Sequence, residues 1–357
     1  MPTKRRVTIA QIAEEAGVSV PTVSKVINGR PEVASATRQR VERLLHKHGY
    51  QRRTGQGDGP VGLLDLVFAE IESPWAMELV RGAEAAARDA GASIVMSVLH
   101  THAGPGRDWL ERIAARRTDG VIIVSSKVSA RQQGQLSARS IPFVVIDPEG
   151  EPAPGVASVG ATNWHGGLAA TRHLIDLGHT RIGMIGGPPD MLCSRARIDG
   201  YRAALETAGL EIDHGLIRHG DFLVNSGHDH GHDLLSLPDP PTAIFAGCDM
   251  QAFGVFEAAR QRGLRVPEDL SVVGFDDLPL SQSAWPPLTT VCQPLQEMAA
   301  LAARMVLAMG RGEGAETRRV ELSTDLVVRE STAPPRKPAG TAPEPARRGG
   351  GGTEIED

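Results

Sequence analysis

Eight side chains suited to recognising a small polar ligand lie where predicted strands end or where the next helices begin. Arginine and aspartate each form paired hydrogen bonds with neighbouring hydroxyl groups, and an aromatic ring covers the apolar face of a sugar ring. Arg197, Asp276 and Trp75 supply that combination. The other candidates are Ser73, Asp147, Asn163, Phe222 and Cys248. The sequence therefore predicts a site for a sugar or a related small molecule.

These candidates also have purely structural interpretations. Arg197 would otherwise be a cation on a helix surface, and Asp276 a turn residue or helix cap, which is a common role for aspartate. We favour ligand contact for both, because both follow predicted strands that face one shared cleft. Packing and ligand binding both remain open for the aromatic residues Trp75, Phe222, Trp164 and Trp285.

The elements that must position these side chains alternate between apolar runs and helical patterns from residue 61 onward. That alternation is typical of doubly wound parallel sheets, in which ligands bind beyond the carboxyl ends of the strands. The predicted strands are 62–68, 93–98, 120–124, 142–146, 181–185, 243–246 and 270–275. The predicted helices are 75–90, 108–116, 163–177, 195–208, 226–237 and 249–262. Two further carboxylates, Asp249 and Asp277, also follow strand ends.

A different pattern occupies residues 8–29, which are predicted to form two short helices joined by a tight turn. Thr8 and Ser19 are suited to cap the two helices, Gly17 to close the first, and Pro21 to the first turn of the second. Such a pair is a helix-turn-helix unit, whose second helix enters the major groove of DNA.

The charge distribution agrees with this interpretation. Residues 1–53 carry a net charge of +7, and the remaining residues carry −12. A basic head on an acidic body is expected of a protein that binds DNA and is regulated by a separate domain. A third helix is predicted from Ser35 to about His48, completing the basic head.

The same stretch resembles the headpiece of the LacI family of transcription regulators. It follows a Thr-Ile-x-x-Ile-Ala-x-x-Ala-Gly-Val-Ser-x-x-Thr-Val-Ser pattern and continues with Asn-Gly. Further similar stretches occur at 173–179, 185–188, 272–277 and 287–291, so the resemblance covers residues 7 to about 332. It implies an α/β protein in which a small all-α helix-turn-helix domain precedes a two-lobed doubly wound parallel-sheet domain, of the periplasmic-binding-protein type.

The resemblance also implies which residues contact DNA. Val20, Pro21 and Lys25 match base-reading positions, and Lys25 is able to donate to guanine edges. The complete set of predicted DNA-contacting residues is Thr8, Ser19, Val20, Pro21, Thr22, Lys25, Asn28, Arg52 and Arg53.

The predicted domain organisation departs from the family at one segment. Residues 51–60 form a linker that lacks the hinge-helix leucine of most members and contains three glycines and a proline, which oppose a helix. The predicted segments are 1–50 for the DNA-binding headpiece, 51–60 for the linker, 61–332 for the effector-binding and dimerisation domain, and 333–357 for a disordered tail. Within that domain, lobe one is expected at about 61–161 and 292–322, and lobe two at about 162–291 and 323–332.

The resemblance finally suggests function. Arg197, which stands before Gly-Tyr, and Asp276, the first aspartate of Gly-Phe-Asp-Asp, match effector contacts of the family. We therefore expect a homodimeric repressor that binds double-stranded operator DNA and responds to a sugar or related small molecule. The alternatives are a solute-binding protein for sugar uptake, and a regulator that responds to a purine or to no ligand.

Several classes of protein are not indicated. No signal-type segment or membrane-spanning apolar run occurs, so we expect a cytoplasmic protein associated with the nucleoid and not with a membrane. His228 and His232 share a helix face, but no third ligand lies nearby in sequence, so no metal is expected. No catalytic signature appears, and we expect neither an enzyme nor a cofactor.

Overall fold

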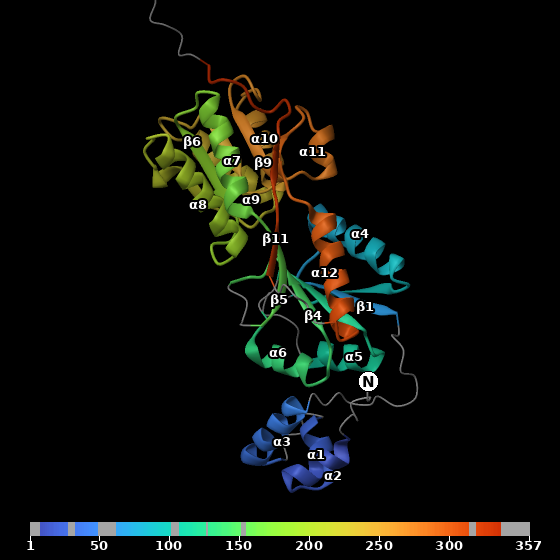
Figure 1. Cartoon of the computed structure of the whole chain (residues 1–357). Helices are drawn as coiled ribbons and strands as arrows, with labels where there is room; N and C mark the ends of the chain where they lie inside the picture. The colour runs from blue at the N-terminus through green and yellow to red at the C-terminus, as the bar shows by residue number, and fades with distance from the viewer. Residues whose placement is uncertain are drawn as a thin grey trace, which may run out of the picture.

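The computed structural model describes residues 8–27, 33–48, 62–100, 107–125, 128–150, 155–313 and 319–336. A three-helix unit comes first in the chain, followed by two lobes that each contain one sheet (Figure 1). The predicted fold class is confirmed. Three of the predicted DNA-contacting residues, Asn28, Arg52 and Arg53, lie outside the described residues, as does the linker at 51–60.

Local capping interactions set the ends of the helices in the three-helix unit, and a small apolar core holds the helices together. Its helices are α1 (Ile9–Ala16), α2 (Val20–Ile27) and α3 (Ser35–Lys47). Thr8 forms a capping box with Gln11, and Gly17 ends α1 with a φ of 62°. The three helices enclose one apolar cluster, whose buried members are Ile12, Ala13, Ala16, Val23, Val26 and Val41.

Lobe one contains a six-stranded parallel sheet in the order β11-β5-β4-β3-β1-β2. Its strands are β1 (Leu63–Phe68), β2 (Ser93–Val98), β3 (Gly120–Val124), β4 (Phe143–Ile146), β5 (Ala157–Ala161) and β11 (Arg319–Leu322). Its helices are α4 (Pro74–Asp89), α5 (Arg107–Arg116), α6 (Ala130–Ser137) and α12 (Leu295–Gly310). Apolar side chains on alternate strand positions pack against α4 and α12 on one face and against α5 and α6 on the other.

Lobe two repeats this arrangement with the strand order β12-β10-β9-β8-β6-β7, in which only the β10–β12 pair is antiparallel. Its strands are β6 (Ile182–Gly186), β7 (Ile217–His219), β8 (Ala243–Ala246), β9 (Ser271–Asp276), β10 (Thr289–Cys292) and β12 (Asp325–Val327). Its helices are α7 (Asn163–Asp176), α8 (Leu192–Thr207), the short 3-10 helix η1 (His214–Leu216), α9 (Val224–Leu235), α10 (Asp249–Gln261) and α11 (Pro279–Ser283). Helices α7 and α8 cover one face of the sheet, and α9 and α10 cover the other.

The chain passes between the two sheets three times, after β5, after β10 and after β11. The first and third crossovers are hydrogen-bonded to each other. The Thr324 amide donates to the Thr162 hydroxyl at 3.0 Å, and the Thr162 amide donates to the Leu322 carbonyl at 2.9 Å. The lobes are therefore joined by a narrow, internally bonded hinge.

The end of the chain corrects one predicted boundary. Disorder was expected from residue 333 onward, but residues 333–336 lie against lobe two. The Ser271 hydroxyl donates to the Ala333 carbonyl at 2.9 Å, and Arg336 pairs with Asp269 at 2.7 Å. Polar groups on lobe two hold these four residues in place. Their polar, proline-containing sequence does not indicate these contacts.

Lobe one depends on a close approach between helices from opposite ends of the chain, α4 and α12 (Figure 1). A Cβ atom added at Gly82 would lie 2.0 Å from the backbone oxygen of Gln296. Only a residue without a side chain fits there, because the clash is with backbone and not with a flexible side chain.

We predict that Gly82→Ala lowers the free energy of unfolding by about 1–3 kcal/mol, because the two helices must separate. Gly134→Ala is the matched control. Gly134 lies within α6, and an added Cβ there would meet nothing within 4 Å. This control is expected to raise stability by about 0.5–1 kcal/mol. Urea unfolding followed by circular dichroism measures both, and equal effects of the two substitutions would contradict the close-approach argument.

Candidate functional site

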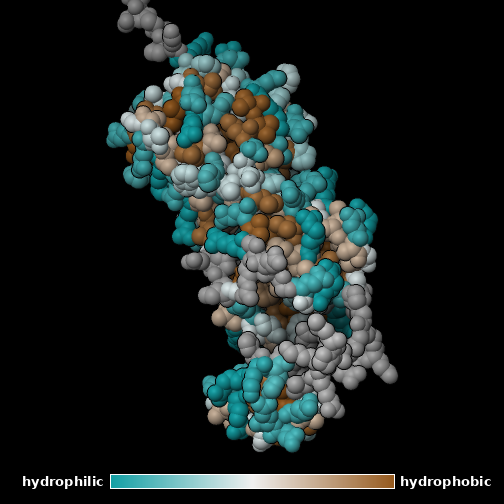
Figure 2. Space-filling model, in the orientation of Figure 1, coloured by the Kyte–Doolittle hydropathy of each residue, from teal (hydrophilic) through white to brown (hydrophobic). Residues whose placement is uncertain are grey.

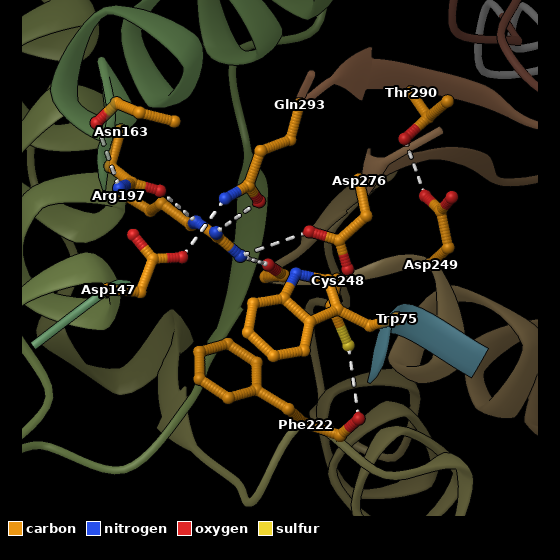
Figure 3. A network of polar contacts seen from close by, with 12 residues as sticks. Trp75, Asp147, Asn163, Arg197, Phe222, Cys248, Asp249, Asp276, Thr290 and Gln293 are labelled. Carbon is orange, nitrogen blue, oxygen red and sulfur yellow. Dashed lines mark hydrogen bonds and ion pairs between the residues drawn. The ribbon is translucent and has the colours of Figure 1, made fainter. Parts of the chain in front are cut away.

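A cavity of about 110 Å³ lies between the lobes, and we call it the central cavity. Its lining residues are Ser73, Trp75, Ser125, Asp147, Met191, Cys193, Arg197, Phe222, Cys248 and Asp276. Seven of the eight predicted ligand-contacting residues are among them. Figure 3 shows the charged groups of Asp147, Arg197 and Asp276 gathered together, with the rings of Trp75 and Phe222 on one side of them.

Arg197 is the centre of this group and is only 4% exposed. Its Nε donates to Asn163 Oδ1 at 2.8 Å, its Nη1 to the Gly247 carbonyl at 2.6 Å, and its Nη2 to Gln293 Oε1 at 3.2 Å. The guanidinium also stacks on the Phe275 ring, 3.7 Å from its centroid. These contacts hold the guanidinium in one orientation.

Close packing of α7 against α8 delivers Arg197 to this position. A Cβ atom at Gly167 of α7 would lie 2.3 Å from the Arg197 carbonyl oxygen, and one at Gly200 of α8 would lie 2.2 Å from the Trp164 carbonyl oxygen. The two glycines let the helix backbones touch, so Asn163 at the start of α7 reaches Arg197. Asn163 therefore orients Arg197, and it lines a second cavity beside the central one and not the central cavity itself.

Asp276 ends β9 and faces the same cavity. Its Oδ1 is buried without a hydrogen-bond partner and lies 3.7 Å from Arg197 Nη1. Burial raises the pKa of Asp276 well above its usual value, and the positive charge of Arg197 opposes that shift. A buried acceptor without a donor is costly, so a ligand hydroxyl that donated to Oδ1 would satisfy it.

Asp147 directly follows β4 and brings a carboxylate from lobe one. Gln293, in the crossover between β10 and α12, donates from its Nε2 to Asp147 Oδ2 at 3.1 Å and accepts from Arg197 through its Oε1. Burial also raises the pKa of Asp147. Gln293 thus connects the charged groups of the two lobes, although no pattern in the sequence marks this residue.

Four residues that line the central cavity have left-handed backbone conformations. Their φ angles are 43° for Ser125, 44° for Asp147, 67° for Phe222 and 114° for Asp276. Non-glycine residues seldom adopt such angles, and they concentrate where a surrounding structure imposes them at functional sites. This strain aims the side chains at strand ends into the cavity.

The cysteines contribute packing and not charge. The Cys248 thiol caps α10, donates to the Phe222 carbonyl at 3.2 Å and accepts from the Gln251 amide. Burial raises the pKa of Cys248 well above its usual value and that of Cys193 to about 11. Cys193, Ser125 and Met191 also line the cavity but were not predicted, because no pattern in the sequence marks them.

Two carboxylates that follow strand ends have internal partners instead. Asp249 accepts hydrogen bonds from the Leu278 amide and from the hydroxyls of Ser281 and Thr290, and it clamps α11 and β10 to α10. Asp277 pairs with Arg329 at 2.6 Å.

The two other tryptophans differ in position. Trp164 lines a second cavity beside the central one, whereas Trp285 is 93% exposed and lines neither cavity. For Trp285, the exposed position therefore supports neither packing nor ligand binding, the two interpretations that the sequence left open.

The headpiece presents the predicted reading positions at its surface. Ser19, Val20, Pro21 and Lys25 are exposed at the start and along one side of α2, opposite the buried Val23 and Val26. Thr22 is half-buried, and its hydroxyl lies 2.9 Å from that of Ser19. The Thr8 hydroxyl takes part in the cap of α1.

Comparison with known proteins identifies relatives of both the headpiece and the two-lobed domain. The model of bacterial regulatory proteins of the lacI family matches residues 8–53, and a periplasmic binding protein-like domain matches residues 171–332. The HTH-type transcriptional regulator CelR of Thermobifida fusca is 35% identical over 353 residues, covering 93% of this chain and 100% of the relative. The chain belongs to the LacI family of bacterial regulatory proteins. It is accordingly a DNA-binding transcription regulator and not an enzyme, and the relatives favour this function over the solute-binding alternative.

Solved LacI-family structures share the fold. A CelR–cellobiose complex has a TM-score of 0.68 at 35% identity and covers 91% of this chain and 100% of its own. The lac repressor dimer bound to operator and the anti-inducer ONPF has a TM-score of 0.67 at 27% identity, covering 92% and 100%. Along the described part of this LacI-family chain, no helix has the length and apolar character needed to cross a membrane.

We predict that Asp249 makes the stability of lobe two depend on pH. Burial raises the pKa of Asp249 to about 6, so the folded state holds a proton at pH values where the unfolded state has lost it. The contribution of Asp249 to the free energy of unfolding therefore rises as the pH falls, and Asp249→Asn, which does not titrate, removes that contribution. From pH 7 to pH 5 the wild type should gain about 1 kcal/mol over the variant.

Urea unfolding of both proteins at the two pH values measures this difference. Asp199→Asn is the control, because Asp199 is an exposed carboxylate on α8. If the difference in the free energy of unfolding between the wild type and Asp249→Asn is the same at both pH values, the predicted pH dependence is wrong.

Proposed function

We propose that this LacI-family regulator is a homodimeric repressor whose operator affinity is controlled by a carbohydrate bound in the central cavity. The observation that carries the proposal is the buried Asp276 Oδ1, which lacks a donor and faces the fixed guanidinium of Arg197. An acceptor and a donor side by side match two adjacent hydroxyl groups of a sugar, each of which both donates and accepts.

The remaining lining residues suit the same ligand. Asp147 adds a second carboxylate from lobe one, and Trp75 and Phe222 place aromatic rings against the polar groups. Sugars combine a hydroxyl-bearing rim with apolar C–H faces, so this mixture of charges and rings complements both parts. The CelR structure that this chain resembles holds a disaccharide, cellobiose.

The proposed coupling runs through Gln293. It bridges Asp147 of lobe one and Arg197 of lobe two, and it lies in a crossover between the lobes. A sugar that took over either contact would change the relative free energies of the lobe arrangements. A ligand shifts such an equilibrium only by its difference in affinity for the two states.

The proposed homodimer follows from the way helix-turn-helix headpieces bind DNA. A two-fold symmetric protein reads a near-palindromic operator, one half-site for each headpiece. Exposed apolar side chains that are available for a subunit interface include Ile71, Met77 and Met96 on lobe one and Leu280 and Val328 on lobe two. Figure 2 shows apolar residues at the surface of both lobes. Because a repressor must reach its operator DNA, we place the protein in the cytoplasm at the nucleoid.

We predict that Asp276→Asn weakens sugar binding about tenfold to a hundredfold, since it removes charge-assisted hydrogen bonds worth about 1.5–3 kcal/mol. Isothermal titration of the full chain with glucose, xylose, galactose, cellobiose and maltose gives the affinities. Asp199→Asn, on the exposed side of α8, is the control and should bind as the wild type does. If adenine or guanine binds the wild type and no sugar does, the carbohydrate proposal is wrong.

We predict that Lys25→Ala lowers operator affinity about tenfold or more and relaxes the base preference at one position of each half-site. The control is Lys47→Ala, which removes the same charge from a side chain that pairs with Glu15 at 2.9 Å. Selection of bound sequences from random DNA, followed by titration at several salt concentrations, measures preference and affinity. Steep salt dependence is expected, because Val20 and Pro21 offer only apolar contacts and phosphate contacts must supply more of the affinity. An unchanged preference in Lys25→Ala would show that the base reading lies elsewhere.

A further inference from the structure

A second cavity, of about 380 Å³, adjoins the central cavity, and we call it the side chamber. It lies along β5 and β11, between these strands and the starts of α7 and α8. Asp147 and Cys193 line both cavities. The central cavity alone is smaller than the roughly 300–1,000 Å³ usual for ligand sites, whereas the side chamber falls within that range.

The Asp147 carboxylate faces both spaces. Its Oδ2 accepts from Gln293, within the network around Arg197. Its Oδ1 points toward β5, because a Cβ atom added at Gly160 would lie 3.5 Å from it, and Gly160 lines the side chamber. A single carboxylate is thus placed to accept from hydroxyl groups on either side.

The side chamber carries its own aromatic surface. Trp164, in the first turn of α7, is 39% exposed, which is unusual for so large an apolar side chain. Its ring is held edge-to-face by His165, at a centroid distance of 5.1 Å and an interplanar angle of 85°. An exposed indole with a fixed orientation provides a platform for the C–H face of a sugar ring.

Charged groups stand beside this indole. Arg319 and Glu321 lie two residues apart on β11, so their side chains project from the same face of the sheet. Arg319 Nη2 lies 3.3 Å from Glu321 Oε1, and both side chains are about half exposed, so donors and acceptors remain open to the chamber. The side chamber therefore repeats, with different residues, the combination of an aromatic ring, an arginine and carboxylates found in the central cavity.

We propose that the effector is an oligosaccharide of at least two units, with one ring in the central cavity and the next in the side chamber against Trp164. This inference rests on the proposed carbohydrate function and specifies the size of the ligand. Asp147 lies at the junction and receives hydroxyl groups from both rings. Arg319 and Glu321 contact the second ring alone.

The test compares disaccharides with their own monosaccharides on the full chain. Cellobiose, maltose, lactose and xylobiose are titrated by calorimetry, together with glucose, galactose and xylose. At least one disaccharide should bind about tenfold or more tightly than the monosaccharides it contains, since it gains the contacts of the second ring.

Two substitutions then test the side chamber in different ways, one by filling it and one by removing its aromatic ring. Gly160→Val fills it from β5, where the backbone is extended and the added Cβ makes only the ordinary 3.5 Å contact with Asp147. Trp164→Ala removes the platform. Each should weaken binding of the preferred disaccharide about tenfold and leave any monosaccharide affinity within about twofold of the wild type. Because the monosaccharide is measured on the same protein, it reports directly whether the central cavity is intact.

The outcomes separate the two proposals. Disaccharides that bind no more tightly than their monosaccharides, or whose affinity survives both substitutions, would overturn the oligosaccharide inference and leave the carbohydrate function standing. Equal losses for both sugar sizes would also overturn it, because the substitutions would then act through the central cavity. A wild-type protein that binds none of these sugars would contradict the carbohydrate function and the inference together.

Discussion

The burial of one guanidinium group governs the arrangement of the ligand-binding domain. A charged group removed from water is strongly destabilising unless every donor finds a partner. Arg197 finds those partners in Asn163 at the first crossover, the Gly247 carbonyl after β8, Gln293 at the second crossover and the ring of Phe275 in β9. Because these groups come from separate parts of the chain, the guanidinium stays satisfied only while the strand ends and crossovers keep their relative positions.

The carboxylates around Arg197 are less well stabilised than the guanidinium itself. Asp276 has an unpartnered oxygen, burial raises the pKa values of Asp147 and Asp276, and both residues have left-handed backbone angles. Strain and unsatisfied polarity of this kind persist where the surrounding fold imposes them, and they prepare a site for a ligand. The nearby Asp249 shows the contrast, since its three hydrogen-bond donors make it a structural clamp.

Backbone contact at glycines gives the lobes the packing that holds this site. Gly82 admits α12 against α4, and Gly167 and Gly200 admit α7 against α8. Close-packed interiors resist gradual deformation, so the lobe movement that the proposed coupling requires is expected to concentrate in the three crossovers. Thr162, Gln293 and Thr324 lie in these crossovers, so in the proposed coupling they are the positions where a bound ligand acts on the lobe arrangement.

The sequence by itself determined the features that depend on local interactions. The Thr8 cap, the Gly17 turn and the apolar periodicity identified the helix-turn-helix unit, and strand ends located Arg197, Asp147 and Asp276 near one cleft. Short strands such as β5, β11 and β12 were not assigned, because a few residues carry too little pattern.

Only the tertiary structure decided which polar groups remain without a hydrogen-bond partner. Asp249 and Asp276 both follow strands, but Ser281 and Thr290 satisfy the first while nothing satisfies one oxygen of the second. Likewise, Asn163 and Gln293 became visible as supports of Arg197 only when residues more than thirty positions apart met in space.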